Sequence, residues 1–340
     1  MKFPANIGNT TEKAAFQTAD LLWQDVAGMV EQLIAAPEEN CVYAVLKSGV
    51  SGNAVVAVKN ADGAVVWSYH LWVADFDPDA NVMTWTDSES GTSYKMMDRY
   101  VGAVSNQPGS DLSNGLFYQW GRKDPFVGAD GTESSVYVLK YDIDGNRVRE
   151  VSEERPTYPS SDYESTNLPV SIQNPNTFYF APSSAWPVVD WLTDDAQRQN
   201  HDLWGGVSGY KTKYDPCPEG WKVPVAGAPW GFRKEYKKAG ALNDGQPYDS
   251  TYPWFIEYDD AYCIGFRYKQ ADSGKEYWFP FTGKKDCNKG DLSGVGGGAN
   301  YHTATCQNTL AIMEMFAWGN PASETGLNRP YGSSVRCIKE

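Results

Sequence analysis

The sequence predicts an α+β fold of short antiparallel strands, a few short helices and long loops. Its 340 residues include 32 glycines and 20 prolines, which is a turn-rich composition. Apolar runs are short, and no segment repeats at the period of about 20–50 residues that solenoids and propellers show. Because 41% of the residues are hydrophobic and 14% are aromatic, the chain has enough apolar surface for a sizeable core.

The first expected element is a helix over residues 19–36. Apolar residues recur there at helical spacing, and Pro37 follows the segment, as a proline often follows a helix. Gly28 counts against this interpretation, since glycine weakens a helix interior. Residues 1–39 are therefore taken as an N-terminal helix, linker or extension ahead of one main domain, residues 40–340.

Beyond residue 40 the pattern changes to strands. Five short runs are bounded by turn residues and have the composition of strands. They are Val42–Leu46, Ala54–Val58, Val65–Val73, Val136–Asp142 and Arg147–Val151. Asp62-Gly63 and Asp144-Gly145 lie between consecutive runs and are typical of hairpin turns.

The next segments are expected to be less regular. Residues 152–176 are rich in Ser, Pro, Asn and acidic residues, which is typical of a long exposed loop or an insertion. Residues 184–196 predict one or two helical turns. Residues 229–240 predict a short helix that ends at Gly240. The C-terminal third is irregular, Gly-rich and aromatic.

Charge and hydropathy exclude two classes of partner. The formal net charge is -14, so the chain repels a phosphate backbone and nucleic acid is not an expected partner. No apolar run reaches the length of about 18 residues that a transmembrane helix needs, so the protein is not expected to span a membrane. Residues 1–6 lack the apolar stretch of a signal peptide. The protein is either cytoplasmic or has lost a leader before this numbering begins.

The residues give no catalytic or metal-binding constellation. The three histidines, His70, His201 and His302, are far apart and do not have zinc-type spacing with cysteine. Residues 294–298 are Gly-rich but lack the Lys-Ser/Thr of a phosphate loop. Residues 142–146 resemble the start of a calcium loop, but a hairpin turn accounts for them better. We therefore expect no enzyme activity, no cofactor and no metal.

Six cysteines are present, and no two of them form Cys-x-x-Cys. From the residues alone they are either buried free thiols or structural disulfides, depending on the compartment. They are Cys41, Cys217, Cys263, Cys287, Cys306 and Cys337.

Four segments together resemble a known family. Their order, with a Cys-Pro-x-Gly-Trp and a Val-Arg-Cys element, is similar to the Fibrobacter succinogenes major paralogous domain, which is common in surface and fimbrillin-associated proteins of Bacteroidetes. The segments are Met97–Ala103, Gly115–Phe126, Tyr214–Pro224 and Gly332–Lys339. The resemblance covers most of residues 40–340, although His302 stands where the family usually has a tryptophan.

The resemblance implies a C-type-lectin-like fold, with small antiparallel sheets, about two short helices and a long loop region. In such folds a cysteine near the first helix bridges to the last strand, and Cys217 and Cys337 match that pattern by position. The resemblance therefore implies a Cys217–Cys337 disulfide. It also implies an exported protein, at the cell surface or outside the cell, whose leader is absent from this numbering. The sequence elements of calcium-dependent sugar binding are missing, so that activity does not follow from the fold.

The function that the resemblance implies is a binding protein, adhesin-like or pilus-tip-like, with a glycan or protein ligand. Its C-terminal loops would present amide and aromatic groups, which stack on and hydrogen-bond to such ligands. For each of these residues, packing within its own loop is the alternative. The candidates are His302, Gln307, Asn308, Trp318, Asn320, Asn328 and Tyr331. The alternative function is a non-catalytic assembly subunit or lipoprotein that docks a pilus or another surface protein.

Overall fold

Strands dominate the computed structural model, with 40% of residues in strands and 8% in helices. The described part of the chain forms six sheets and one α-helix, α1 (Leu168–Gln173). The predicted α+β, C-type-lectin-like fold with two helices is therefore wrong, and the fold is β-rich. The structure describes residues 1–87, 89–132, 136–159, 161–162, 165–232, 254–258, 264–270, 273–317 and 320–340.

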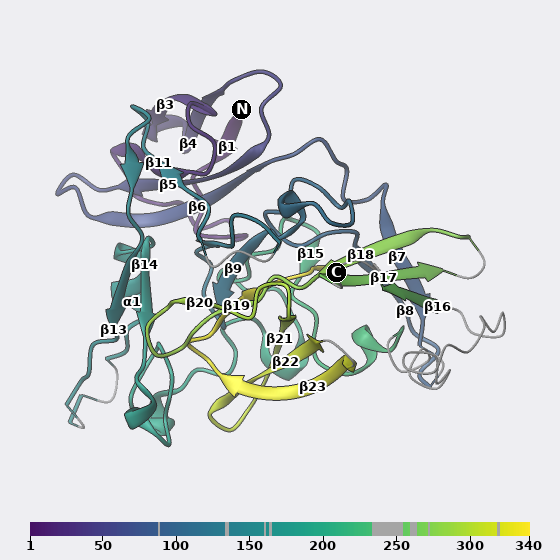
Figure 1. Ribbon diagram of the computed structural model, residues 1–340. Helices are drawn as coiled ribbons and strands as arrows, with labels where there is room; N and C mark the ends of the chain where they lie inside the picture. The colour runs from purple at the N-terminus through teal and green to yellow at the C-terminus, as the bar shows by residue number, and fades with distance from the viewer. Residues whose placement is uncertain are drawn as a thin grey trace.

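Two sheets pack face to face at the N-terminal end and form a small β-sandwich, called the sandwich below (Figure 1). Apolar side chains of both sheets meet between them, among them Val42 from one sheet and Val58 and Trp67 from the other. The smaller sheet has the order β1-β4-β3, with β1 (Lys2–Pro4), β3 (Val30–Ala36) and β4 (Cys41–Leu46). The larger has the order β12-β11-β2-β5-β6, with β2 (Thr18–Gln24), β5 (Gly52–Lys59), β6 (Val65–Val73), β11 (Lys140–Tyr141) and β12 (Arg147–Val148).

The helix predicted over residues 19–36 is wrong, because this segment forms β2 and β3. Gly28, with φ 74°, lies in the turn between them. The side chain of Gln24 closes the turn by accepting a hydrogen bond from the Val30 N–H at 2.7 Å. β2 pairs with β5 and β3 pairs with β4. The helical spacing of the apolar residues in this segment fits two half-buried strands as well, and the strand pairing determines which structure forms.

The strand predictions are confirmed to different extents. β6 has the predicted bounds, and β4 and β5 include the two runs before it. Of the run Val136–Asp142, only β11 is a strand, and Arg147–Val151 gives the short β12 and the first residue of β13 (Val151–Glu154). The predicted loop over residues 152–176 contains most of β13 and all of α1. β13 pairs in parallel with β14 (Thr177–Phe180).

The other helical segments that the structure describes in full are single 3₁₀ turns. Only η3 and the start of η4 fall in the segment 184–196 that was predicted to hold helical turns. Only η6 and two further described residues fall in 229–240, and residues 233–240 lie outside the described chain. The turns are η1 (Pro37–Glu39), η2 (Asp111–Ser113), η3 (Ser183–Ala185), η4 (Ala196–Arg198), η5 (Gly206–Ser208) and η6 (Ala228–Trp230).

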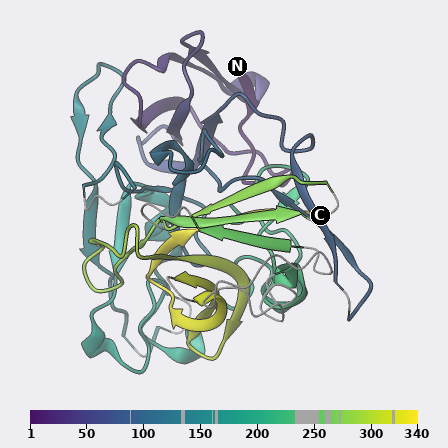
Figure 2. The same ribbon diagram turned by 45° about the vertical axis from the view of Figure 1, so that its right-hand side comes forward.

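A central sheet brings distant parts of the chain together, with the order β10-β9-β24-β21-β22-β23 and a side ribbon of β19 and β20. Both ribbon views place the sandwich at one end of the molecule and the β21–β23 strands toward the other (Figures 1 and 2). The strands are β9 (Leu116–Gln119), β10 (Phe126–Val127), β19 (Lys284–Lys285), β20 (Leu292–Ser293), β21 (Gly298–Gln307), β22 (Leu310–Ala317), β23 (Asn320–Asn328) and β24 (Gly332–Ser334).

Two further sheets complete the body. One has the order β15-β25-β8-β7, and the other is the meander β16-β17-β18. The strands are β7 (Val82–Thr86), β8 (Ser93–Met97), β15 (Trp221–Lys222), β16 (Trp254–Tyr258), β17 (Gly265–Gln270), β18 (Glu276–Pro280) and β25 (Ile338–Lys339).

Aromatic residues fill the core of this strand-rich body. Among the described residues six tryptophans are fully buried, so their first role is packing: Trp23, Trp120, Trp191, Trp204, Trp221 and Trp230. The four segments that carry the family resemblance also lie inside. Phe117–Gln119 pairs with Gly332–Ser334, Trp221 pairs with Lys339, and the Met97 N–H donates to the Cys337 carbonyl at 2.9 Å. No helix of the described chain has the length and apolar character needed to cross a membrane.

Candidate functional site

His302, the first predicted ligand residue, lies in the core. Its side chain is fully buried, and its Nε2–H donates to the Tyr118 carbonyl at 2.7 Å. The edge of the imidazole packs on Trp204, with 5.2 Å between ring centroids. Burial lowers the pKa of His302 to about 4. A ligand outside the protein therefore has no access to this ring, and the prediction for His302 is wrong.

The other predicted residues do not gather in one place. Gln307 and Asn308 are exposed at the turn between β21 and β22, and Asn328 pairs with Leu310 near the same end. The backbone of Asn320 pairs with Ala317 at the opposite end of β22. Half-buried Tyr331 lies under the Lys284 ammonium at 4.5 Å. Trp318 lies outside the described residues.

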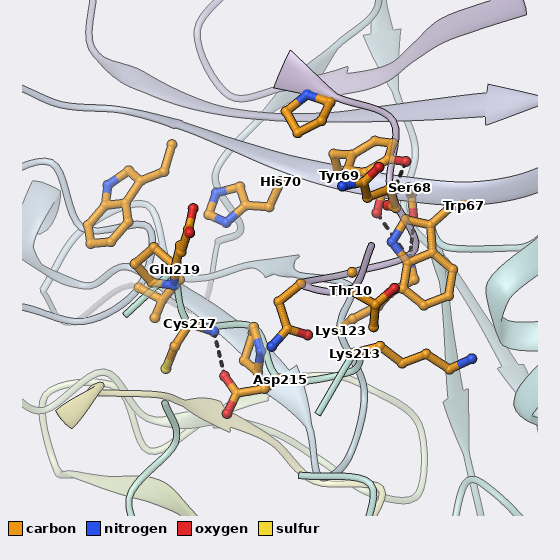
Figure 3. A pocket seen from close by; sticks show the side chains of 18 of the residues that line it. Thr10, Trp67, Ser68, Tyr69, His70, Lys123, Lys213, Asp215, Cys217 and Glu219 are labelled. Atoms are coloured by element: carbon orange, nitrogen blue, oxygen red, sulfur yellow. Dashed lines mark hydrogen bonds between the residues drawn. The ribbon is translucent and has the colours of Figure 1, made fainter. Parts of the chain in front are cut away.

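A cleft of about 500 Å³, called the sandwich cleft below, opens where the sandwich meets the segment around Cys217 (Figure 3). Three parts of the chain line it: loop residues 6–11, strand β6 and residues 213–219. Lys123 adds a cation to its wall. Single-sequence reasoning missed this site because its walls come from segments that are far apart along the chain.

The alternation of β6 directs side chains to both sides of the sheet. Trp67 and Tyr69 pack in the sandwich core and reach the cleft as well. Ser68, His70 and Trp72 point the other way, toward the body, where Trp72 Nε1 donates to the Ala103 carbonyl at 3.2 Å. In residues 67–72, large side chains occur at both alternating sets of positions. This pattern is the sequence signal that both faces of the strand are covered.

A chain of hydrogen bonds fixes the tautomer of His70. The Asp25 carboxylate accepts from Asn53 Nδ2 at 2.7 Å, so the Asn53 oxygen faces His70 Nε2 at 2.9 Å. His70 Nε2–H therefore donates, and its Nδ1 accepts from the Tyr118 hydroxyl at 3.3 Å. Burial lowers the pKa of His70 to about 3. The ring is thus a neutral part of the wall and a poor proton donor or acceptor for chemistry near pH 7.

Ser68 and Lys123 also belong to a closed network. A serine beside a lysine is a pair that can act as nucleophile and base. Here the Ser68 hydroxyl donates to Asp124 Oδ1 at 2.6 Å and accepts from the Lys123 ammonium. Lys123 Nζ lies 2.5 Å from the same carboxylate oxygen, and 4.5 Å from the centre of the Trp67 ring. These bonds join the sandwich to the body. Burial lowers the pKa of Lys123, and the neighbouring Asp124 carboxylate opposes that shift.

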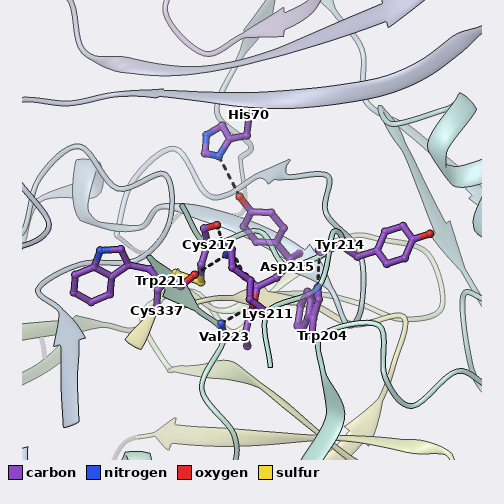
Figure 4. The surroundings of a disulfide bond; sticks show 10 residues. His70, Trp204, Lys211, Tyr214, Asp215, Cys217, Trp221, Val223 and Cys337 are labelled. Atoms are coloured by element: carbon purple, nitrogen blue, oxygen red, sulfur yellow. Dashed lines mark hydrogen bonds and ion pairs between the residues drawn. A yellow bond between two sulfur atoms is a disulfide. The ribbon is translucent and has the colours of Figure 1, made fainter. Parts of the chain in front are cut away.

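The opposite wall is a rigid loop built on Asp215. Its buried carboxylate accepts from the Cys217 and Val223 N–H groups at 2.8 and 2.9 Å, and lies 3.3 Å from the Lys211 ammonium. The predicted disulfide Cys217–Cys337 is confirmed, with 5.9 Å between Cα atoms and a sequence separation of 120 residues (Figure 4). The Tyr214–Pro224 motif is therefore a structural support for this wall.

Four side chains remain available at the cleft: Asn9, Thr11, Lys213 and Glu219. No hydrogen bond or ion pair joins any of them to another side chain within the described part of the chain, although the Lys213 ammonium lies 5.5 Å from the centre of the Tyr214 ring. Together they offer an amide, a hydroxyl, a cation and a carboxylate beside aromatic rings. Such a set can bind a ligand that both donates and accepts hydrogen bonds.

Metal binding receives no support from the described residues, which contain no group of three or more His, Cys, Asp or Glu side chains able to hold an ion. Cys41 and Cys287 are buried free thiols and Cys306 is a half-buried one, while Cys263 lies outside the described residues.

Comparison with known proteins gives no relative from which a function follows. No family model matches the chain, no curated protein matches it, and no solved structure matches it.

Proposed function

We propose that this chain is a non-catalytic binding protein of the cell exterior, and that the sandwich cleft holds a neutral or weakly charged glycan. The observation that carries the proposal is the set of unpaired polar groups around an aromatic cleft of about 500 Å³. Sugars present many hydroxyl groups that donate and accept hydrogen bonds, and apolar faces that stack on aromatic rings. The resemblance of four segments to a domain common in bacterial surface proteins favours the same role.

The titratable groups of the cleft favour binding over catalysis. His70 is neutral and occupied on both ring nitrogens, and Lys123 is held by its contacts with Ser68 and Asp124. General acid–base catalysis needs a group that changes its protonation state near the working pH and reaches the substrate. The Cys217–Cys337 disulfide favours an exported protein, because disulfides persist in oxidising compartments.

The test is an array of neutral and acidic glycans probed with the purified chain, with and without EDTA. Lys213→Ala and Glu219→Gln are the cleft variants, and Lys95→Ala and Glu31→Gln are matched controls at exposed positions outside the cleft. We expect a glycan that binds without metal, and a loss of affinity of at least fivefold for each cleft variant alone. An empty array with folded protein, or equal losses in the control variants, would contradict the proposal and favour an assembly subunit.

A further inference from the structure

A second cavity, of about 670 Å³, concentrates positive charge in an acidic protein. Lys140, Arg147, Arg149 and Lys289 line it, with Glu150 and Asp291 as the acidic residues of its wall. It lies beside β11 and β12, at the opposite edge of the five-stranded sheet from β6 and the sandwich cleft. We call it the basic pocket.

Glu150 in the wall of the basic pocket is shared by two buried lysines: Lys140, which lines the pocket, and Lys285, which does not line it. Lys285 Nζ bonds to Glu150 Oε1, and Lys140 Nζ lies 3.6 Å from Glu150 Oε2. The side chains of both lysines are at least 97% buried, so two basic groups share one carboxylate away from water, and burial lowers the pKa of each lysine. Among the described residues, no second carboxylate forms an ion pair with either lysine.

The hydrogen-bond and ring contacts of the two lysines, apart from Glu150, are with neutral groups, while the Asp291 carboxylate acts on Lys285 from a greater distance. Lys140 donates to Asn176 Oδ1 at 2.6 Å. Lys285 lies 4.2 Å from the centre of the Tyr137 ring and 5.1 Å from that of Phe178. Aromatic faces stabilise a cation, but they do not neutralise it. Burial lowers the pKa of Lys140 to about 8, as expected for an ammonium with incomplete compensation.

At the mouth of the pocket the arginines and Lys289 add exposed cations. Arg147, Arg149 and Lys289 form no ion pair with any carboxylate of the described chain, although acidic residues outnumber basic ones by 43 to 29 in the whole sequence. Three exposed cations without an ion pair among the described residues therefore border the same cavity. Arginine and lysine in this arrangement are the usual partners of oxyanions.

From this geometry we infer that the basic pocket is a second ligand site, which binds an oxyanion group: a sulfate, phosphate or carboxylate. The bound anion adds a second negative charge near Lys140 and Lys285, which otherwise share the Glu150 carboxylate. It accepts hydrogen bonds from Arg149 and Lys289 at the mouth of the pocket. The site shares no lining residue with the sandwich cleft, so it stands independently of the function proposed for that cleft.

The test is calorimetric titration of the full chain with three probes: inorganic sulfate, an oligogalacturonate and a heparin-derived hexasaccharide. The pocket variant is Arg149→Ala with Lys289→Ala. The control is Lys47→Ala with Lys95→Ala, which removes the same charge at exposed positions elsewhere. We expect at least one probe to bind, a rise in Kd of at least tenfold in the pocket variant, and less than twofold in the control.

The probes separate the sources of the oxyanion. Binding of an oligosaccharide that the pocket variant loses supports a glycan-borne group, and pocket-dependent binding of sulfate alone supports a free ion. Absence of binding to all three probes, or equal losses in the pocket and control variants, overturns the inference.

A second measurement needs no variant. The side-chain carbon resonances of Lys140, followed by NMR against pH, are expected to show a rise in its pKa of at least half a unit when the ligand is bound, because the added anion favours the charged ammonium. An unchanged Lys140 titration at saturating ligand overturns the inference.

Discussion

Gly8 lies against the backbone of Lys213. Its φ is 61°, and a Cβ at this position would lie 2.3 Å from the Lys213 carbonyl oxygen. This contact sets how closely the loop of residues 6–11 approaches residues 213–219, and thus the width of the sandwich cleft. Only glycine satisfies both the backbone conformation and the close approach.

The first prediction follows from this contact. Gly8→Ala is expected to lower the free energy of unfolding by about 2–4 kcal/mol, from left-handed strain and a backbone clash together. Gly49→Ala is the control, because Gly49 also has positive φ, 73°, but nothing within 4 Å of its Cβ position. It isolates the strain, of about 1–2 kcal/mol. Urea denaturation measures the loss of stability in both variants. Equal losses would show that the loop of residues 6–11 is not in contact with residues 213–219.

The second prediction concerns the disulfide. Replacing both Cys217 and Cys337 by serine is expected to lower the free energy of unfolding by about 2–5 kcal/mol, because the bond closes a long loop. Wild-type protein treated with a reducing agent is the comparison, and it should lose a similar amount. The double variant should not respond to the reductant. A response of the variant would mean that other thiols determine the redox sensitivity.

The third prediction is a pH dependence from His302. The pKa of His302 is about 4 in the folded protein, below the value of about 6.5 that an unfolded chain has. Between these values the unfolded state binds more protons, so the stabilising contribution is complete above pH 6.5 and is lost as the pH falls toward 4. The stability advantage of wild type over His302→Gln should shrink by about 2 kcal/mol from pH 7 to pH 4.5. Urea denaturation across this range measures it, and an advantage that stays constant contradicts the assignment.

The fourth prediction concerns the shared carboxylate. Lys140→Met removes one of the two buried basic groups that share Glu150 and should leave the free energy of unfolding unchanged or higher, whereas Glu150→Gln leaves both lysines without a carboxylate and should cost about 3–5 kcal/mol. Thermal and urea unfolding of the two variants provide the measurement. If Lys140→Met is the more destabilising of the two, the charge assignment is wrong.

The same lysine predicts a second pH dependence. The pKa of Lys140 is about 8, below the unfolded value of about 10.4. The unfolded state therefore binds more protons between these values, and wild type should gain stability relative to Lys140→Met as the pH rises from 8 to 10. A constant difference over this range contradicts a depressed pKa.

The sequence predicted local strands better than their assembly. β6 was found at its full length because β-branched and aromatic residues follow an Asp-Gly turn, and both signals act within a few residues. The helix over residues 19–36 failed because the spacing of its apolar residues fits two half-buried strands equally well, and the pairing of β2 with β5 is not visible in the local pattern.

The candidate site shows the same limit. The pairing of Cys217 with Cys337 was available only through the family resemblance, since six cysteines allow many pairings. The sandwich cleft joins residue 8 to residue 213, and one sequence contains no signal for that contact. His302 was misplaced because its accessibility depends on the register of β21 against β22 and on the packing of Trp204, both of which are tertiary properties.

The position of β24 and β25 has a consequence for biosynthesis. Residues 332–339 complete the middle of the central sheet and the partner strand of β15, and they provide the second cysteine of the disulfide. A growing chain therefore lacks the centre of its largest sheet until these residues emerge, and its aromatic core stays open for most of synthesis. Until these strands pair, the apolar and aromatic side chains that the finished sheet covers stay exposed, which favours aggregation of the incomplete fold.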